Sequence, residues 1–295
     1  MNRFFLILAF VLAFPILGNA QRKRAFLVGV STYKTHGYKV WNNIHGADDI
    51  ALLTPELKKK GFKASDIVTI LNEQATCHNI LSSLDEFIKT THKNDLVYIH
   101  FSCHGQPVED GLNGYSKDEK DGWDESLIPI DAGKAYDVNG YQGKNHITDD
   151  TLNIYIERLR KKIGAKGMLY VAMDACHAGE ISRRGLETVR GTNEGFTKNG
   201  IKYNPPISNV KHYSLKKSPE LSPAMFIEAC QSRERNTEVR IGGKEYGALS
   251  YNIYQAFRNM GSFGNRDSLL FKSKIEASTK EKGHWPRTQT LVIER

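Results

Sequence analysis

Residues 169–180 read LYVAMDACHAGE. The apolar run 169–173 is typical of a strand that is buried on both faces of a parallel sheet. It stops at Asp174, and a thiol and an imidazole follow at Cys176 and His177. Ligands of open α/β sheets bind at the carboxyl ends of the strands. The stretch therefore predicts a strand that presents reactive side chains at one edge of a sheet.

A second stretch has the same form. Residues 95–105 read DLVYIHFSCHG. If the two strands are parallel neighbours, His104 and Cys176 meet at the same edge, and a Cys–His pair is the minimum for a thiol nucleophile. Residues two apart on a strand point to the same face. We therefore expect Asp174 beside Cys176, Ser102 beside His104, and Cys103 turned into the core.

Strand and helix patterns alternate along the chain. This order predicts an α/β fold with a mostly parallel sheet and helices on both faces. The polar stretch 180–223 is expected to be one long irregular loop, and a second polar insertion covers 106–144. We expect strands at 25–31, 66–71, 95–102, 167–174, 224–230 and 288–294, and helices at 46–60, 76–92, 149–163, 246–260 and 267–279.

The first twenty residues differ from the rest of the 295-residue chain. Arg3 precedes the apolar stretch 4–17, and Gly18-Asn19-Ala20 offers small residues for cleavage. The pattern predicts a Sec-type signal peptide at 1–20, and hence a periplasmic or secreted protein that is not membrane-bound after cleavage. An uncleaved anchor is the alternative, but the apolar stretch is short for a span. We expect the remainder, 21–295, to form one domain.

Charge and cysteine content exclude other classes. The net charge of +8 comes from Lys and Arg spread along the chain without an aromatic-interleaved stripe, so no nucleic-acid partner is expected. Four cysteines, at 77, 103, 176 and 230, allow at most one disulfide if Cys176 is a working thiol. Three Cys-His dipeptides raise the question of zinc, but no metal-binding spacing supports it. We expect Cys103 and Cys77 to be structural.

The stretches HFSCHG and MDACHAG resemble the two motifs of caspase-like cysteine peptidases, and they are most similar to those of bacterial metacaspases. The resemblance runs from about residue 24 to the C-terminus. It implies a caspase-like α/β/α sandwich with a mostly parallel six-stranded sheet, a large-subunit-like part at 24–180, a polar loop at 181–223 and a small-subunit-like part at 224–295. Asp48, in place of the usual Asn, and Ala178, in place of the common Ser, depart from the family pattern. Similar segments stand at 46–50 (GADDI), 121–131 (DGWDESLIPID), 147–150 (ITDD), 226–230 (FIEAC) and 246–250 (YGALS).

The resemblance implies peptide hydrolysis through an acyl-enzyme. Cys176 would be the nucleophile, and His104 would protonate the leaving amine and then activate water. The backbone N–H groups of Gly105 and Cys176 would form the oxyanion hole. The chemistry itself requires no cofactor, and we expect a monomer that acts on peptides or proteins.

The resemblance also carries Asp49, Ser102 and Asp174 onto the pocket that binds the substrate side chain before the cleaved bond, here called the specificity pocket. Carboxylates in such a pocket would pair with Arg or Lys. For Asp49 alone, an ordinary first-turn acid of a helix is an alternative. Asp174, at a strand end beside a thiol, has no such explanation.

Two regulatory features follow from the same resemblance. Asp131, Asp149 and Asp150 match calcium ligands of related metacaspases, and hard oxygen donors suit calcium. Arg183 stands where the family has a further acid, which weakens this expectation; helix first-turn acids are the alternative for Asp149 and Asp150.

The polar loop contains three arginines, Arg183, Arg184 and Arg190, which we expect to be exposed. An enzyme that cuts after basic residues could process itself there and so be made as a zymogen. Incidental arginines in a flexible loop are the alternative.

Two other functions remain open at this point. One is a catalytically silent caspase-like protein used for binding or regulation. The other is a gingipain-like, clostripain-like or legumain-like peptidase with the same Cys–His dyad. The presence of both Cys176 and His104 argues against the first, and the 121–131 segment favours metacaspases over the second.

Overall fold

The computed structural model describes residues 21–33, 40–112, 121–176, 187–204 and 217–295. The expected signal peptide, His177, Arg183 and Arg184 lie outside these residues. None of the helices in the described ranges combines the length and apolar character that crossing a bilayer requires.

A six-stranded sheet forms the centre of the molecule, in the order β11-β8-β7-β3-β1-β2. Its first five strands along the chain run parallel, and β11 pairs antiparallel with β8. The mostly parallel sheet is therefore confirmed. Its strands are β1 (Lys23–Gly29), β2 (Ile67–Leu71), β3 (Leu96–Ser102), β7 (Met168–Asp174), β8 (Ala224–Glu228) and β11 (Val292–Glu294).

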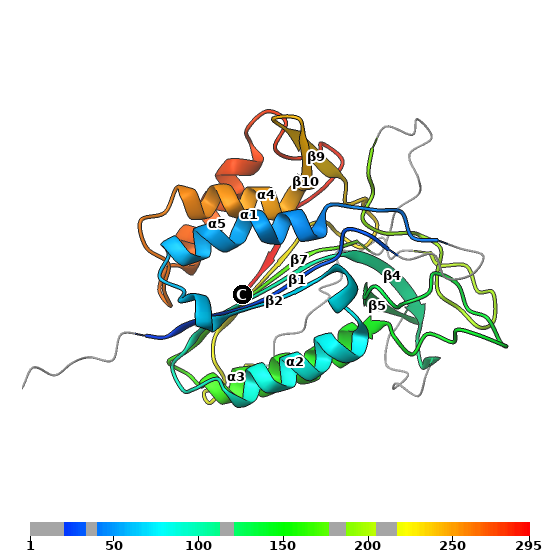
Figure 1. The fold of residues 1–295 in the computed structure, drawn as a ribbon, viewed down its shortest axis with the longest axis horizontal. Helices are drawn as coiled ribbons and strands as arrows, with labels where there is room; N and C mark the ends of the chain where they lie inside the picture. Colours follow the sequence, from blue (N-terminus) through cyan, green and yellow to red (C-terminus); the bar gives the residue numbers. More distant parts are fainter. Residues whose placement is uncertain (1–20, 34–39, 113–120, 177–186, 205–216) are drawn as a thin grey trace, which may run out of the picture.

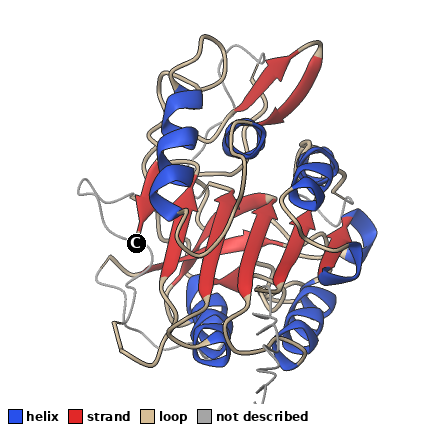
Figure 2. Cartoon of the chain, turned by 90° about the vertical axis from the view of Figure 1, so that its left-hand side faces the viewer, coloured by secondary structure: helices blue, strands red, loops and turns tan. Residues whose placement is uncertain are grey.

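Helices cover both faces of this sheet, as predicted (Figures 1 and 2). One face carries α1 (Gly46–Lys59), α4 (Ala248–Arg258) and α5 (Ser268–Thr279), and the other carries α2 (Cys77–Lys89) and α3 (Asp149–Ile163). Short 3₁₀ turns, η1 (Ala64–Asp66) and η2 (Asn72–Gln74), flank β2.

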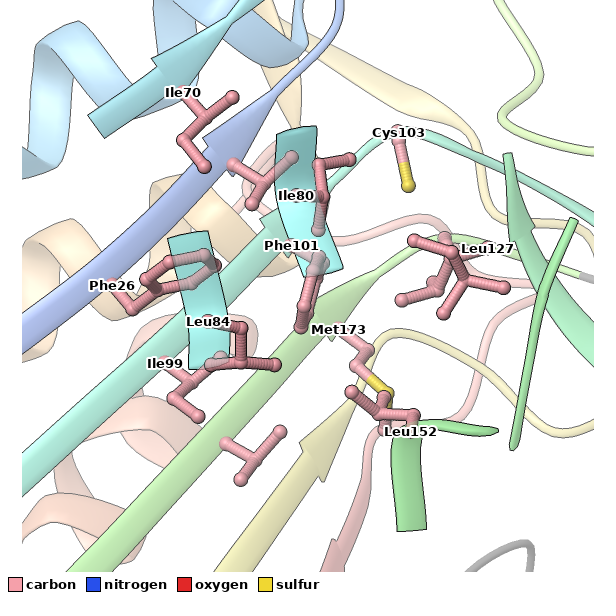
Figure 3. Close-up of a cluster of buried hydrophobic side chains, with 14 of the residues drawn as sticks. Phe26, Ile70, Ile80, Leu84, Ile99, Phe101, Cys103, Leu127, Leu152 and Met173 are labelled. Atoms are coloured by element: carbon pink, nitrogen blue, oxygen red, sulfur yellow. The ribbon is translucent and has the colours of Figure 1, made fainter. Parts of the chain in front are cut away.

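The apolar side chains of α2 and α3 recur at helical spacing, and they pack on the face of the sheet opposite to α1, α4 and α5. Figure 3 shows part of this cluster, in which Phe26, Ile99 and Phe101 of the sheet meet Leu84 of α2 and Leu152 of α3. Burial of such side chains is the main stabilising term of the fold.

Strands β3 and β7 position the reactive side chains. Both strands are buried throughout, and they pair in register so that Ser102 lies opposite Asp174. The two strands therefore end side by side, as the sequence predicts. Cys103 is buried in the apolar cluster of Figure 3, and Cys77 starts α2. All four cysteines are free thiols.

Two small sheets were not predicted, and the start of one helix differs from the prediction. The polar insertion 106–144, for which no strands were predicted, contributes to a small antiparallel sheet of β4 (His104–Glu109), β5 (Trp123–Ile128) and β6 (Ile147–Thr148). A hairpin of β9 (Glu238–Ile241) and β10 (Lys244–Gly247) was also not predicted, and α4 begins two residues later than expected. These strands are short and polar. Strand β4 is hydrogen-bonded to a segment far away in the sequence, since the N–H of Phe196 donates to the carbonyl of Pro107 at 2.8 Å.

Candidate active site

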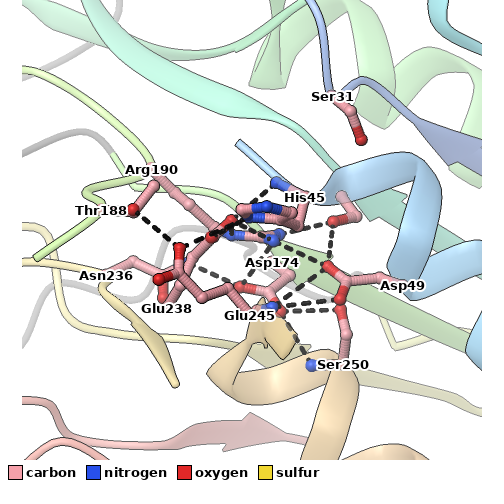
Figure 4. A network of polar contacts seen from close by, with 12 residues as sticks. Ser31, His45, Asp49, Asp174, Thr188, Arg190, Asn236, Glu238, Glu245 and Ser250 are labelled. Atoms are coloured by element: carbon pink, nitrogen blue, oxygen red, sulfur yellow. Dashed lines mark hydrogen bonds and ion pairs between the residues drawn. The ribbon is translucent and has the colours of Figure 1, made fainter. Parts of the chain in front are cut away.

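The expected specificity pocket contains a guanidinium from this same chain. Asp49, Ser102 and Asp174 are brought together around Arg190, and all four residues are fully buried (Figure 4). Nη2 of Arg190 lies 2.8 Å from Oδ2 of Asp49, and Nη1 donates to Oγ of Ser102 at 2.5 Å and lies 3.8 Å from Oδ1 of Asp174. A third carboxylate, Glu238, accepts from Nε at 3.0 Å and from Nη2 at 2.7 Å.

The prediction that Arg190 is exposed is therefore wrong. Its side chain is the largest fully buried one in the described part of the chain. A buried cation is tolerated only when it is paired and hydrogen-bonded, and the carboxylates of Asp49, Asp174 and Glu238 supply that pairing.

Asp174 is held from the carboxyl end of β7 by the first turn of α4. The backbone N–H and the hydroxyl of Ser250 donate to Oδ2 of Asp174 at 2.8 and 2.7 Å, and Nδ2 of Asn236 donates to Oδ1 at 2.7 Å. A helix N-terminus favours a negative charge. Asp174 is therefore fixed as a carboxylate acceptor.

Asp49 is held differently. It lies in the first turn of α1, which agrees with the alternative of a first-turn acid, but its carboxylate faces the pocket. It accepts the backbone N–H of Gly247 at 3.0 Å and the hydroxyl of Ser102 at 2.7 Å.

One guanidinium faces three buried carboxylates, and the titration of the group reflects this imbalance. Burial raises the pKa of Asp49 to about 7, although Arg190 opposes the shift. Burial also opposes ionisation of Asp174, but Arg190 and the hydrogen bonds from Asn236 and Ser250 outweigh it, so the pKa of Asp174 lies below its ordinary value. Burial would lower the pKa of Arg190, and the three carboxylates instead hold it above its ordinary value.

The carbonyl of Arg190 occupies the expected oxyanion hole. It accepts the N–H of Cys176 at 3.0 Å and the N–H of Gly105 at 3.4 Å. A side chain at position 105 would place its Cβ 2.4 Å from the carbonyl oxygen of Cys176. Glycine is therefore required for this close approach.

The chain around Arg190 forms backbone hydrogen bonds with residues 236–238. Its N–H donates to the carbonyl of Asn236 at 2.9 Å, and the N–H of Glu238 donates to the carbonyl of Thr188 at 2.9 Å. Val189 thereby pairs antiparallel with Thr237. Residues 188–190 bind as an added β-strand does, with backbone hydrogen bonds and one side chain in a pocket.

Cys176 lies next to the bond that follows Arg190. It pairs with Gly191, where a Cβ would lie 2.0 Å from the carbonyl oxygen of Cys176 and 3.2 Å from its Cβ. The thiol is 1% exposed, lies in contact with Cys230, and donates to the carbonyl of Glu234 at 2.8 Å.

His104 is fixed by backbone and aromatic contacts. Its Nε2 lies 2.8 Å from the carbonyl oxygen of Asn42, and its ring stacks on Trp41 with the ring centroids 4.8 Å apart. Tyr33 accepts the backbone N–H of His104 at 3.0 Å. Because a carbonyl only accepts, Nε2 carries the proton and Nδ1 is left as a base.

Nδ1 of His104 is buried and has no hydrogen-bond partner, so it does not bond to the thiol of Cys176. Burial lowers the pKa of His104 to about 4, and the imidazole is therefore neutral at pH 7. A cavity of about 700 Å³ beside it is lined by His104, Trp41 and residues 191–195. Both predicted dyad residues thus lie close to Gly191: Cys176 pairs with it, and His104 lines the same cavity.

The predicted calcium ligands come from the chain after β5 and from the first turn of α3. Asp131 accepts the N–H of Cys77 at 2.9 Å, and Asp149 and Asp150 are first-turn acids of α3. In the described part of the chain, the only three His, Cys, Asp or Glu residues with ligand atoms within 4.8 Å of one another are His45, Glu238 and Glu245. Calcium dependence stays a prediction.

Sequence reasoning missed Glu238 and Asn236, which come from the polar stretch after β8. It also missed Tyr33 and Trp41, which fix His104. No local pattern marks these residues, because each acts across a large distance in the chain. The sequence signal was the reactive side chains at the ends of two apolar strands. That signal identifies only Ser102, His104, Asp174 and Cys176.

The chain is similar to known proteins of one family. The model of the metacaspase family, peptidase C14 domain, matches residues 23–183. Metacaspase-1 of Lodderomyces elongisporus is 25% identical over 270 residues, which are 78% of this chain and 56% of that protein. Metacaspase-3 of Arabidopsis thaliana is 26% identical over 276 residues, 90% of this chain and 68% of that protein. The chain thus spans little more than half the length of the first of these relatives.

Two solved structures share the fold. Protein GSU0716 from Geobacter sulfurreducens superposes with a TM-score of 0.60 at 17% identity, covering 92% of each chain. Caspase-1 from Spodoptera frugiperda superposes with a TM-score of 0.50 at 12% identity, covering 93% of this chain and 86% of that chain.

Proposed function

Because this chain belongs to the metacaspase family of C14 peptidases, we propose that it is a cysteine endopeptidase that cuts after Arg or Lys and processes itself at the Arg190–Gly191 bond. One observation carries the proposal. Arg190 has its side chain among three carboxylates and its carbonyl oxygen on the N–H groups of Gly105 and Cys176. A substrate arginine would make the same two sets of contacts.

The chemistry follows from the groups around this bond. The sulfur of Cys176 attacks the carbonyl carbon of the substrate arginine, and the charge that develops on oxygen is stabilised by the N–H groups of Gly105 and Cys176. The thiol proton passes through Nδ1 of His104 to the leaving amine, and an acyl-enzyme remains. Water then attacks the thioester, its proton is taken by Nδ1, and the acid is released with the free thiol restored.

The intact chain is latent on this proposal. While Arg190 fills the specificity pocket and residues 188–190 pair with residues 236–238, an external peptide has no access to the same positions. Cleavage after Arg190 would divide the chain and allow the new ends to leave. We also propose that the protein is exported, that its signal peptide is removed and that it acts as a monomer.

Two preparations test the proposal, each starting at Gln21: the natural sequence and Cys176→Ala. Intact mass and N-terminal sequencing should find a fragment that begins at Gly191 in the first and only the full chain in the second. Fluorogenic peptides ending in Arg, Lys or Asp then report specificity, with and without calcium and with a chelator.

Hydrolysis after Arg or Lys that is lost in Cys176→Ala supports the proposal. Hydrolysis after Asp would refute the pocket assignment. If neither self-cleavage nor peptide hydrolysis occurs under any condition, the protein is a binding or regulatory member of the family.

A further inference from the structure

The third carboxylate of the pocket, Glu238, contacts the guanidinium from a different side than the others. Its Oε1 accepts from Nε of Arg190 at 3.0 Å and from Nη2 at 2.7 Å, and its side chain is 1% exposed. Asp49, Ser102 and Asp174 contact only the two terminal nitrogens, Nη1 and Nη2. Among these four residues, only Glu238 accepts a hydrogen bond from Nε.

A lysine has no donor at that position. The atom of a lysine side chain that corresponds to Nε is Cε, a methylene, and its single nitrogen corresponds to Cζ. A lysine in the pocket could still donate toward Asp49, Ser102 and Asp174. It would leave Glu238 without the Nε–H donor, because Oε1 would face the Cε methylene at that position, and the loss of a hydrogen bond to a buried charged group is costly.

Glu238 cannot easily turn away from a lysine. The backbone N–H of His45 donates to Oε1 at 2.8 Å, and Nδ1 of His45 lies 2.5 Å from Oε2 (Figure 4). The backbone N–H of Glu238 is itself used by the carbonyl of Thr188. His45 therefore holds both carboxylate oxygens independently of the guanidinium, which is the kind of preorganisation that specificity requires.

We propose that Glu238 makes this pocket selective for guanidinium over ammonium, so that the enzyme prefers Arg to Lys. The inference rests on the proposed function and deepens it. A hydrogen bond to a charged group contributes about 1.5–3 kcal/mol. Since about 1.4 kcal/mol is tenfold, the expected preference for Arg is between about tenfold and a hundredfold in kcat/KM.

The first test uses two peptides that differ only in Arg or Lys before the cleaved bond. Glu238→Gln keeps the shape and removes the charge, so hydrolysis after Arg should fall while hydrolysis after Lys stays equal or rises, and the preference should shrink about tenfold. Glu238→Asp withdraws the charge from Nε and should have the same effect. Asp49→Asn is the matched control, because both substrates use Asp49 and both should lose activity by a similar factor.

The second test needs no catalysis. In a chain carrying Cys176→Ala, Arg190→Lys and Glu238→Gln form a double-mutant cycle, read by urea unfolding. Arg190→Lys should lower the folding equilibrium constant about ten- to a hundredfold beside Glu238, and only a few-fold in the Glu238→Gln background.

The outcomes separate the two proposals. An Arg/Lys ratio that Glu238→Gln leaves unchanged, or a cycle whose effects simply add, overturns the role of Glu238. Strong coupling in the cycle without any peptide hydrolysis supports the guanidinium selectivity and refutes the proposed peptidase activity.

Discussion

Removing Arg190 should destabilise the fold by a large fraction of its total stability. The substitution Arg190→Ala leaves Asp49, Asp174 and Glu238 buried without their cation. Breaking a buried pair by removing one partner costs about 3–5 kcal/mol, against a total of about 5–15 kcal/mol for a typical domain. The variant should therefore lose at least about a fifth of its free energy of unfolding, and more if the total stability is low.

Urea unfolding of Cys176→Ala, with and without Arg190→Ala, measures this loss in a chain that cannot cut itself. Arg158→Ala is the control, because Arg158 pairs with Asp85 at 2.7 Å but their side chains are 45% and 36% exposed. That surface pair should contribute about 0–1 kcal/mol.

The loss of free energy of unfolding caused by Arg190→Ala should be smaller at pH 5 than at pH 8. The pKa of Asp49 is already raised to about 7 by burial, so at pH 5 the carboxyl without Arg190 takes up a proton instead of remaining a buried anion. A loss at pH 8 no larger than that of the Arg158→Ala control would show that the pocket fills with water at little cost, and would refute the reasoning.

Three further predictions concern Gly191, Tyr33 and two buried histidines. Gly191→Val should abolish self-cleavage, because a Cβ there would lie 2.0 Å from the carbonyl oxygen of Cys176; a cleavage fragment of unchanged yield in mass spectra would contradict this. Tyr33→Phe removes the acceptor for the N–H of His104 and should lower kcat about tenfold with little change in KM, in peptide kinetics. Burial lowers the pKa of His104 to about 4 and that of His146 to about 3, so the unfolded chain takes up these protons first and stability is lost as the pH falls from about 6.5 toward 4. His146→Asn should flatten that slope in urea unfolding, and an unchanged slope would exclude His146 as its source.

The central sheet could be predicted because parallel strands buried on both faces have continuous apolar sequences. The apolar sequences of β3 and β7 are followed by polar residues, which mark where each strand ends. Because the two strands are neighbours, Ser102 pairs with Asp174. The small antiparallel sheet could not be found in the same way. Its strand β4 contains Gln106 and Pro107, and it is supported by Phe196, almost ninety residues later in the chain.

The pocket was predictable only in part, for a related reason. Asp174 stands at a strand end, where a carboxylate has few structural explanations. Glu238 stands at the start of a short hairpin in a polar stretch, where an acid is ordinary. Its burial depends on His45 and Arg190, which reach it from two distant parts of the chain.

The strand-like binding of residues 188–190 has a kinetic consequence. A ligand attached to the protein that binds it has an effective concentration that is on the order of millimolar for a short flexible connection. A free peptide must compete with that concentration for the same backbone positions and the same pocket, and dilution of the protein does not relieve the competition. Processing at Arg190 should thus be a first-order event, with a half-time that is the same at any enzyme concentration. Each molecule would become active independently of the others.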